Sequence, residues 1–383
     1  MLHFRPGSQL HRLVTLLSVA GEFPTRSLHL LGNERAYKEL VHELTQPQTI
    51  RLYQTDTEMT CRLLTISGKG KSKSVRLYKA ALPILEWLHP DAYRYYMDTF
   101  WNHKFPGDTA HRERNHRVAE SVAMCMGVGI EFRPYLLPEL QNAAILRLLP
   151  DDPVFYLGKN LKKIGQTEMN KTMFTRIVGA LFCENSCYAV YNTRESVMKW
   201  NGMGEFKTLH SLLEIGRLNA GITRVDSALL FGESDSVALN TMLESDKNKR
   251  TEFRFDSIYQ HVHFVPMNHI GAKLLQILAI PDWNENLLQL LFEPDTRSYN
   301  RGSFEYDACV DGIYVLSHLD GDLARLVRFR NAMQNQKVQA EVLCYPSQVP
   351  FLRKYLGRTA SIKTIEIDAV VDALCPERRN LFE

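Results

Sequence analysis

The stretch Ser67-Gly-Lys-Gly-Lys-Ser-Lys-Ser74 decides how the first part of this 383-residue chain is interpreted. β-like runs at Cys61–Ile66 and Ser74–Tyr78 flank it, so we expect it to be the loop of a β-hairpin. Glycine and serine keep such a loop slim and flexible. Its positive charge comes from three residues, Lys69, Lys71 and Lys73. Slim basic hairpins are suited to contact with a phosphate backbone.

Three short helix-like segments precede this hairpin. The first is predicted over Ser8–Ala20, where leucine and valine recur at helical spacing. Thr25 can cap a short second helix, and Asn33 can cap a third helix that carries one apolar stripe. Thr49–Tyr53 is a candidate for an additional strand. Three helices followed by a basic hairpin is the order of a winged helix-turn-helix.

The third helix leaves Arg35, Lys38, Glu39 and His42 on its outer face. A recognition helix needs polar donors on the exposed face and an apolar stripe behind it. We therefore predict DNA contacts from the helix and from the hairpin, namely Arg35, Lys38, His42, Lys69, Lys71, Lys73 and Arg76. The alternative is that the hairpin is only solvated and that the helices form a protein-assembly module without DNA contact.

Positive charge is concentrated in this part of the chain. Through Leu82 there are twelve Lys and Arg residues against six Asp and Glu residues, a net charge of +6, whereas the remainder carries −3. A basic module on a mildly acidic body favours double-stranded DNA as the partner. A homodimer or partner proteins from a mobile element stay open as further partners.

The rest of the chain predicts an α+β protein. We expect a winged helix domain at residues 1–88, linking helices at 89–130 and an α/β body at 131–383, with a further division near 220–250. Within the linking region Asp108 can cap a helix over Thr109–Met126. In the body, strand and helix signals alternate between Ser186 and Ile367.

Composition narrows the class of protein. Hydrophobic residues make up 45% and charged residues 23%, which is typical of a globular protein. No apolar run approaches the roughly 20 residues that span a bilayer, so no membrane contact is expected. The seven cysteines include no C-x-x-C pair, which favours reduced thiols in the cytoplasm and predicts neither a zinc site nor a cofactor.

One motif points to metal chemistry. Alternation on a strand would place His261 and His263 of His261-Val-His263 on one side, which suits a divalent metal. The pattern is also a signature of nucleases that nick DNA through a tyrosine, for which Tyr355 is the candidate. No carboxylate companion is evident, so we interpret the two as ordinary strand histidines and predict no metal-binding or catalytic residue. A metal-dependent strand-nicking enzyme is the alternative function.

Two further sequence patterns that involve acidic positions are only weak evidence for a catalytic site. The run Phe155-Tyr-Leu-Gly-Lys-Asn160-Leu-Lys162 has the spacing of a nuclease strand that ends in acid-x-Lys, but Asn160 replaces the acid. Glu305 and Asp307 could be paired carboxylates, and we interpret them as the polar face of a strand.

Over roughly its first 200 residues the chain resembles the replication-relaxation family of Gram-positive plasmids and conjugative elements. The matching features are the helices over Leu10–Leu44, the hairpin that continues into Val75-Arg-Leu-Tyr-Lys-Ala-Ala-Leu-Pro-Ile-Leu85, the helix His116-Arg-Val-Ala-Glu120 and the stretch Phe155–Trp200. The last of these looks like the nuclease-like half of that family, which is often degenerate. The resemblance implies a DNA-binding winged helix that serves plasmid replication or DNA relaxation on a mobile element, and no catalytic residue is carried over.

Overall fold

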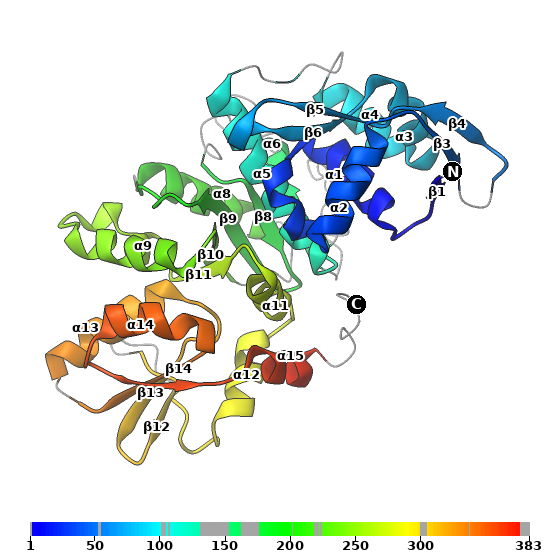
Figure 1. The fold of residues 1–383 in the computed structure, drawn as a ribbon. Helices are drawn as coiled ribbons and strands as arrows, with labels where there is room; N and C mark the ends of the chain where they lie inside the picture. The colour runs from blue at the N-terminus through cyan, green and yellow to red at the C-terminus, as the bar shows by residue number, and fades with distance from the viewer. Residues whose placement is uncertain are drawn as a thin grey trace. The chain divides into compact units, whose positions relative to one another are not determined.

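The computed structural model describes residues 2–52, 55–100, 105, 108–130, 153–161, 176–200, 202–217, 222, 224–298, 305–336 and 338–375. The chain divides into two compact units, Met1–Pro138 and Glu139–Glu383. Helices and strands occur in both units, so the predicted mixture of α and β structure is confirmed (Figure 1). Among the described helices, none is both long enough and apolar enough to cross a membrane.

The N-terminal unit opens with β1 (Leu2–Phe4), α1 (Gln9–Ala20), β2 (Glu22–Pro24), the 3-10 helix η1 (Thr25–Leu31) and α2 (Glu34–Leu44). Asn33 caps α2 as predicted, because its side chain accepts a hydrogen bond from the Ala36 amide at 3.1 Å. Thr25 is not the predicted cap. It lies inside η1, and its hydroxyl donates to the carbonyl of Lys73 at 3.2 Å instead.

Two small sheets follow, built from β3 (Gln48–Leu52), β4 (Glu58–Cys61), β5 (Leu64–Ser67) and β6 (Ser74–Leu77). The order of one is β2-β6-β5, with all pairs antiparallel, and the order of the other is β1-β3-β4. The predicted strand Cys61–Ile66 is therefore wrong, since its two ends belong to different sheets. The break occurs at Leu63, whose amide donates to the carbonyl of Leu44 at the end of α2.

The unit is completed by η2 (Gly70–Ser72) in the hairpin loop, η3 (Lys79–Ala81), α3 (Leu82–Leu88), α4 (Pro90–Thr99) and α5 (Thr109–Gly127). The predicted cap of α5 is confirmed, because the Asp108 side chain accepts a hydrogen bond from the His111 amide at 2.9 Å. Both α4 and α5 pack against α1, and α5 also packs against β2 and η1. The core between them includes fully buried side chains such as Leu13, Phe23 and Val122.

The second unit holds a five-stranded sheet in the order β11-β10-β9-β8-β7. Its elements are β7 (Val154–Leu157), α6 (Gly158–Leu161), β8 (Gly179–Phe182), β9 (Ser186–Arg194), α8 (Met203–Arg217), β10 (Arg224–Gly232), α9 (Asp235–Lys247), η7 (Thr251–Phe253), α10 (Phe255–Ile258), β11 (His261–Pro266) and α11 (His269–Leu278). Strands β9, β10 and β11 are parallel, and helices lie between them along the chain, so the alternation of strands and helices predicted for this region is confirmed. Every residue of the central strand β9 is buried, as expected where a sheet is covered on both faces.

A four-stranded sheet in the order β12-β13-β14-β15 follows. Its elements are α12 (Trp283–Leu291), β12 (Ala308–Val310), β13 (Ile313–Ser317), α13 (Leu323–Gln336), β14 (Ala340–Cys344), η8 (Pro346–Gln348), α14 (Val349–Leu356), β15 (Ser361–Thr364) and α15 (Ile367–Leu374). The Phe264 amide of β11 donates to the carbonyl of Gly321, which lies between β13 and α13, at 2.9 Å. This bond brings β11 beside the segment that follows β13.

Candidate functional site

The helix residues predicted to meet DNA lie on the exposed face of α2. Arg35 pairs with Glu39 at 2.9 Å, and Lys38 pairs with Glu34 at 2.6 Å. His42 is exposed in the last turn. Solvent-exposed pairs of this kind contribute about 0.3–0.5 kcal/mol. Both cations could therefore exchange their partners for a phosphate at little cost.

The three hairpin lysines, Lys69, Lys71 and Lys73, are exposed. In the part of the chain that the structure describes, their ammonium groups make no hydrogen bond or ion pair. The loop turns at Gly68, where φ is +83° and a Cβ atom would lie 2.4 Å from the Ser72 carbonyl oxygen. The same Cβ position lies 3.1 Å from Nη1 of Arg112 on α5, so a fourth cation stands beside the loop.

Arg76 is not the exposed cation that the sequence predicted. Its side chain is only 13% exposed, and it donates through Nε and Nη2 to Oε2 of Glu22 at 3.0 and 2.7 Å. Glu22 stands opposite Arg76 in the β2-β6 pair and is fully buried. Burial opposes ionisation of Glu22, but interactions with His116 and Arg76 outweigh it and lower its pKa to about 2. Arg76 therefore neutralises a buried carboxylate of the core.

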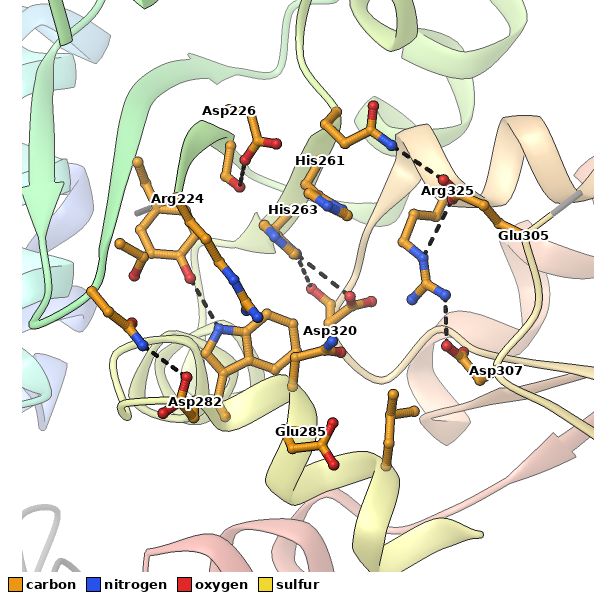
Figure 2. Close-up of a pocket in the computed structure, with 18 of the residues that line it drawn as sticks. Arg224, Asp226, His261, His263, Asp282, Glu285, Glu305, Asp307, Asp320 and Arg325 are labelled. Carbon is orange, nitrogen blue, oxygen red and sulfur yellow. Dashed lines mark hydrogen bonds and ion pairs between the residues drawn. The ribbon is translucent and has the colours of Figure 1, made fainter. Parts of the chain in front are cut away.

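The second unit contains a polar pocket of about 210 Å³ (Figure 2). It lies where the starts of β9, β10 and β11 meet the segment after β13. Its charged and titratable lining residues are Asp226, Asp282, Glu285, Glu305, Asp307, Asp320, Arg224, Arg297, Arg325, His261 and His263. Six carboxylates thus face three arginines and two histidines.

His261 and His263 lie on the same side of β11, as alternation predicts. Their rings are nearly parallel, with centroids 6.1 Å apart. The predicted absence of a carboxylate companion is wrong, because His261 Nδ1 lies 2.7 Å from Oδ2 of Asp322. His263 Nδ1 lies 3.0 Å from the carbonyl oxygen of Asp320, to which it donates. Burial opposes protonation of His261, but the Asp322 carboxylate outweighs it and raises the pKa of His261.

Asp322 and Asp320 differ in their hydrogen bonds and in the direction of their pKa shifts. Oδ1 of Asp322 accepts hydrogen bonds from the amides of Val262, Ala324 and Arg325 at 2.9–3.2 Å, so this carboxylate caps α13 and fastens β11 to it. Burial opposes ionisation of Asp322, but His261 and its other neighbours keep its pKa well below the usual range. Oδ1 of Asp320 accepts from the Asp322 amide at 3.0 Å, and burial raises the pKa of Asp320.

Glu305 and Asp307 are not the polar face of a strand. Both are nearly buried and lie outside the strands, and they hold arginines of α13. Arg325 donates to Asp307 at 2.6 Å, and Arg328 donates to Glu305 at 3.0 Å. Asp307 also accepts from the amide of Ser317 at 2.7 Å. These ion pairs fix one wall of the pocket.

Other predicted features lie away from the pocket. Tyr355 is 4% exposed and is not among the lining residues, so it is not placed as a nucleophile for the two histidines. Asn160 is buried in α6 and not at a strand end, and Lys162 lies outside the described residues. Arg224, in contrast, lines the pocket, and among the described residues no hydrogen bond or ion pair engages its guanidinium.

The sequence did contain a signal for the two aspartates. The run Ile313–Ser317 is followed by His318-Leu-Asp-Gly-Asp322 and then by an apolar helix pattern. Polar residues that follow a parallel strand and precede a helix lie at the carboxyl edge of a sheet, where ligands of α/β proteins commonly bind. The distance of about sixty positions to His261 is what hid their convergence.

No family model, no curated protein and no solved structure matches this chain.

Proposed function

We propose that this protein binds double-stranded DNA through its N-terminal unit, which we interpret as a winged helix-turn-helix. In support, α1, η1 and α2 precede the β5-β6 hairpin, and β2 pairs with that hairpin in the order β2-β6-β5, an arrangement that is compatible with a winged helix. Strands β3 and β4, which lie between α2 and β5, form a separate sheet with β1. In this proposal, helix α2 is the recognition helix. Its eleven residues make a rod of about 16 Å, and the major groove of B-DNA is wide enough to admit a helix.

The observation that carries this proposal is the unpaired charge at the tip of the β5-β6 hairpin. Lys69, Lys71 and Lys73 are exposed, and nothing in the described chain neutralises them. Like-charged residues brought together on one loop repel each other, so their clustering is best explained by an anionic partner. Arg35 and Lys38 are held only by weak exposed pairs on α2 and can add contacts of their own.

The resemblance to the replication-relaxation family supports a more specific role. On that basis the DNA is a plasmid or another mobile element, and binding serves its replication or relaxation, or the regulation of either, in the cytoplasm. Arg76 has no part in the proposed interface, because it is committed to Glu22.

Fluorescence anisotropy of the full chain with a short DNA duplex, titrated over a range of salt concentrations, tests the proposal. Each neutralised phosphate adds about 0.9 to the slope of log affinity against log salt. Replacing Lys69, Lys71 and Lys73 with alanine should therefore lower that slope by roughly 2–3. The matched control replaces Lys249, Lys354 and Lys363, three exposed lysines of the second unit, and should leave the slope unchanged.

Absence of binding at low salt, or equal slopes for the hairpin variant and the wild type, would refute the proposal. Capture of a partner protein by the nuclease-treated chain, combined with absence of DNA binding, would instead favour the assembly module.

A further inference from the structure

We propose that the pocket of the second unit binds one divalent cation, held by His263, Asp320 and Asp322. The three residues come from β11 and from the segment between β13 and α13, and all are buried. This proposal stands independently of DNA binding by the N-terminal unit, because it uses no residue of that unit.

The charge balance of the pocket favours a cation over an anion. Of the six carboxylates that line it, Asp226, Asp282 and Glu285 are exposed, and Glu305 and Asp307 accept from Arg328 and Arg325 at 3.0 and 2.6 Å. The sixth, Asp320, is buried, and no arginine of the described chain pairs with it. Asp322 is also buried; it is not a lining residue, and its carboxylate lies 2.7 Å from His261. A buried carboxylate that lacks a counter-charge is costly, so a positive ion beside Asp320 would lower the free energy of this arrangement.

The donor atoms have the chemistry and nearly the spacing of a metal site. One ring nitrogen of His263 and one carboxylate oxygen from each of Asp320 and Asp322 lie within 4.8 Å of one another. Around an ion with bonds of about 2.1 Å, ligand atoms lie roughly 3–4 Å apart. A contraction of about 1–2 Å in the largest separation would therefore close the site. Mixed imidazole and carboxylate donors suit Mn²⁺ or Zn²⁺.

An unsatisfied oxygen points to a missing ligand. Oδ2 of Asp320 accepts no hydrogen bond from the described chain, although the side chain is only 4% exposed. Nδ1 of His263 lies 3.8 Å from this oxygen, which is beyond hydrogen-bond length, and Figure 2 shows the two groups facing each other. Asp320 lines the pocket, so this oxygen is accessible to a ligand that enters it. A bound cation would supply the partner that the described chain does not.

The surroundings keep the donors in place. Three amides donate hydrogen bonds to Oδ1 of Asp322, and Nδ1 of His261 lies within hydrogen-bond distance of its Oδ2. Hydrogen bonds of this kind orient metal ligands in known sites, and their loss lowers metal affinity 10–100-fold. His261 is therefore a positioning residue for Asp322 in this proposal.

Calorimetric titration of the metal-free full chain with Mn²⁺ tests the site. The wild type should bind one ion, and Asp320→Asn should weaken binding by at least tenfold. The matched control is Asp282→Asn, the same chemical change at a carboxylate in the same pocket, where asparagine also tolerates the local φ of +49°. It should stay within about twofold of the wild type. Absence of Mn²⁺ binding, or equal affinity for Asp320→Asn and wild type, overturns the proposal.

A second measurement does not depend on any variant folding. In NMR spectra of histidine-labelled wild type, substoichiometric Mn²⁺ should broaden the ring signals of His261 and His263 first. The exposed His42 of the N-terminal unit serves as the internal reference. If His42 broadens before His263, the ion is bound elsewhere and the proposal fails.

Discussion

The hairpin loop of the N-terminal unit and the pocket of the second unit are both rich in charge, but they hold it in opposite ways. On the loop, Lys69, Lys71 and Lys73 stand in water without partners. At the pocket, Asp322 is buried and the Arg325 side chain is only 12% exposed, and each is bound by its neighbours. Hydrated charges cost little stability and attract a polyanion from a distance, whereas buried charges must be paired in one geometry. The first arrangement suits a long charged partner, and the second suits a small ligand of defined shape.

Two cations three positions apart, Lys73 and Arg76, show how the backbone makes this difference. Lys73 precedes β6 and is exposed, whereas Arg76 lies within β6 opposite Glu22 and is mostly covered. The two cations are alike in the sequence. Pairing with β2 converts the second into a structural residue.

The largest effect is expected from removing the buried Asp322 carboxylate, which links β11 to α13 beside the pocket. Asp322→Ala would leave three amides and the His261 ring without their shared acceptor. Loss of one partner from a buried charged network costs about 3–5 kcal/mol, so we expect about 4 kcal/mol in urea unfolding of the metal-free protein. Asp226→Ala, at an exposed pocket carboxylate, should change stability by less than about 0.5 kcal/mol. If Asp322→Ala lowers the free energy of unfolding by less than about 1 kcal/mol, the buried charges contribute no more to stability than exposed ones, and the difference between the two regions does not hold.

Lowering the pH should destabilise the N-terminal unit, because this unit also contains a buried charge, the Glu22 carboxylate. The pKa of Glu22 is about 2 when folded, against an ordinary value of 4.5. A lowered pKa contributes stability that is fully present above pH 4.5 and is lost as the pH falls from there toward 2. The shift corresponds to about 3 kcal/mol.

Hydrogen exchange in β2 and β6 measured between pH 5 and pH 2.5 would report this loss. Glu22→Gln should flatten the pH dependence, whereas Glu43→Gln, at an exposed glutamate of α2, should keep it. The same acid response in Glu22→Gln as in the wild type would show that another group is responsible.

Predictions from the sequence were correct where the interacting residues are close in the chain and wrong where they are far apart. The cap at Asn33 and the hairpin around Gly68 were predicted because their signals lie within a few residues of each other. Arg76 was misjudged because its partner Glu22 is more than fifty residues away. The contact between His261 and Asp322 was missed for the same reason. No local sequence pattern predicts which strand contacts which loop.

The shape of the hairpin loop can be tested without changing its charge. A Cβ atom at Gly68 would lie 2.4 Å from the Ser72 carbonyl oxygen, at a φ of +83° that disfavours other residues. Gly68→Ala should therefore destabilise the hairpin by about 2 kcal/mol and weaken DNA binding with all lysines retained. Gly70→Ala meets no atom within 4 Å and should cost only about 1 kcal/mol. Equal DNA affinities for Gly68→Ala and wild type would mean that the lysines attract DNA through their charge alone, whatever the conformation of the loop.

The smallest effect concerns the helix that accompanies this loop. Asn33→Ala would remove the hydrogen bond to the Ala36 amide and expose an unpaired donor at the start of α2, which costs about 1 kcal/mol. Because Arg35 and Lys38 lie within the first turns of α2, fraying there should weaken DNA binding a few-fold while leaving the salt slope unchanged. Asn33→Ser keeps a capping oxygen and should restore both stability and affinity, as measured by urea unfolding and anisotropy. If Asn33→Ala loses stability but binds DNA as well as Asn33→Ser, then α2 does not enter the groove, and the hairpin lysines alone would account for the attraction.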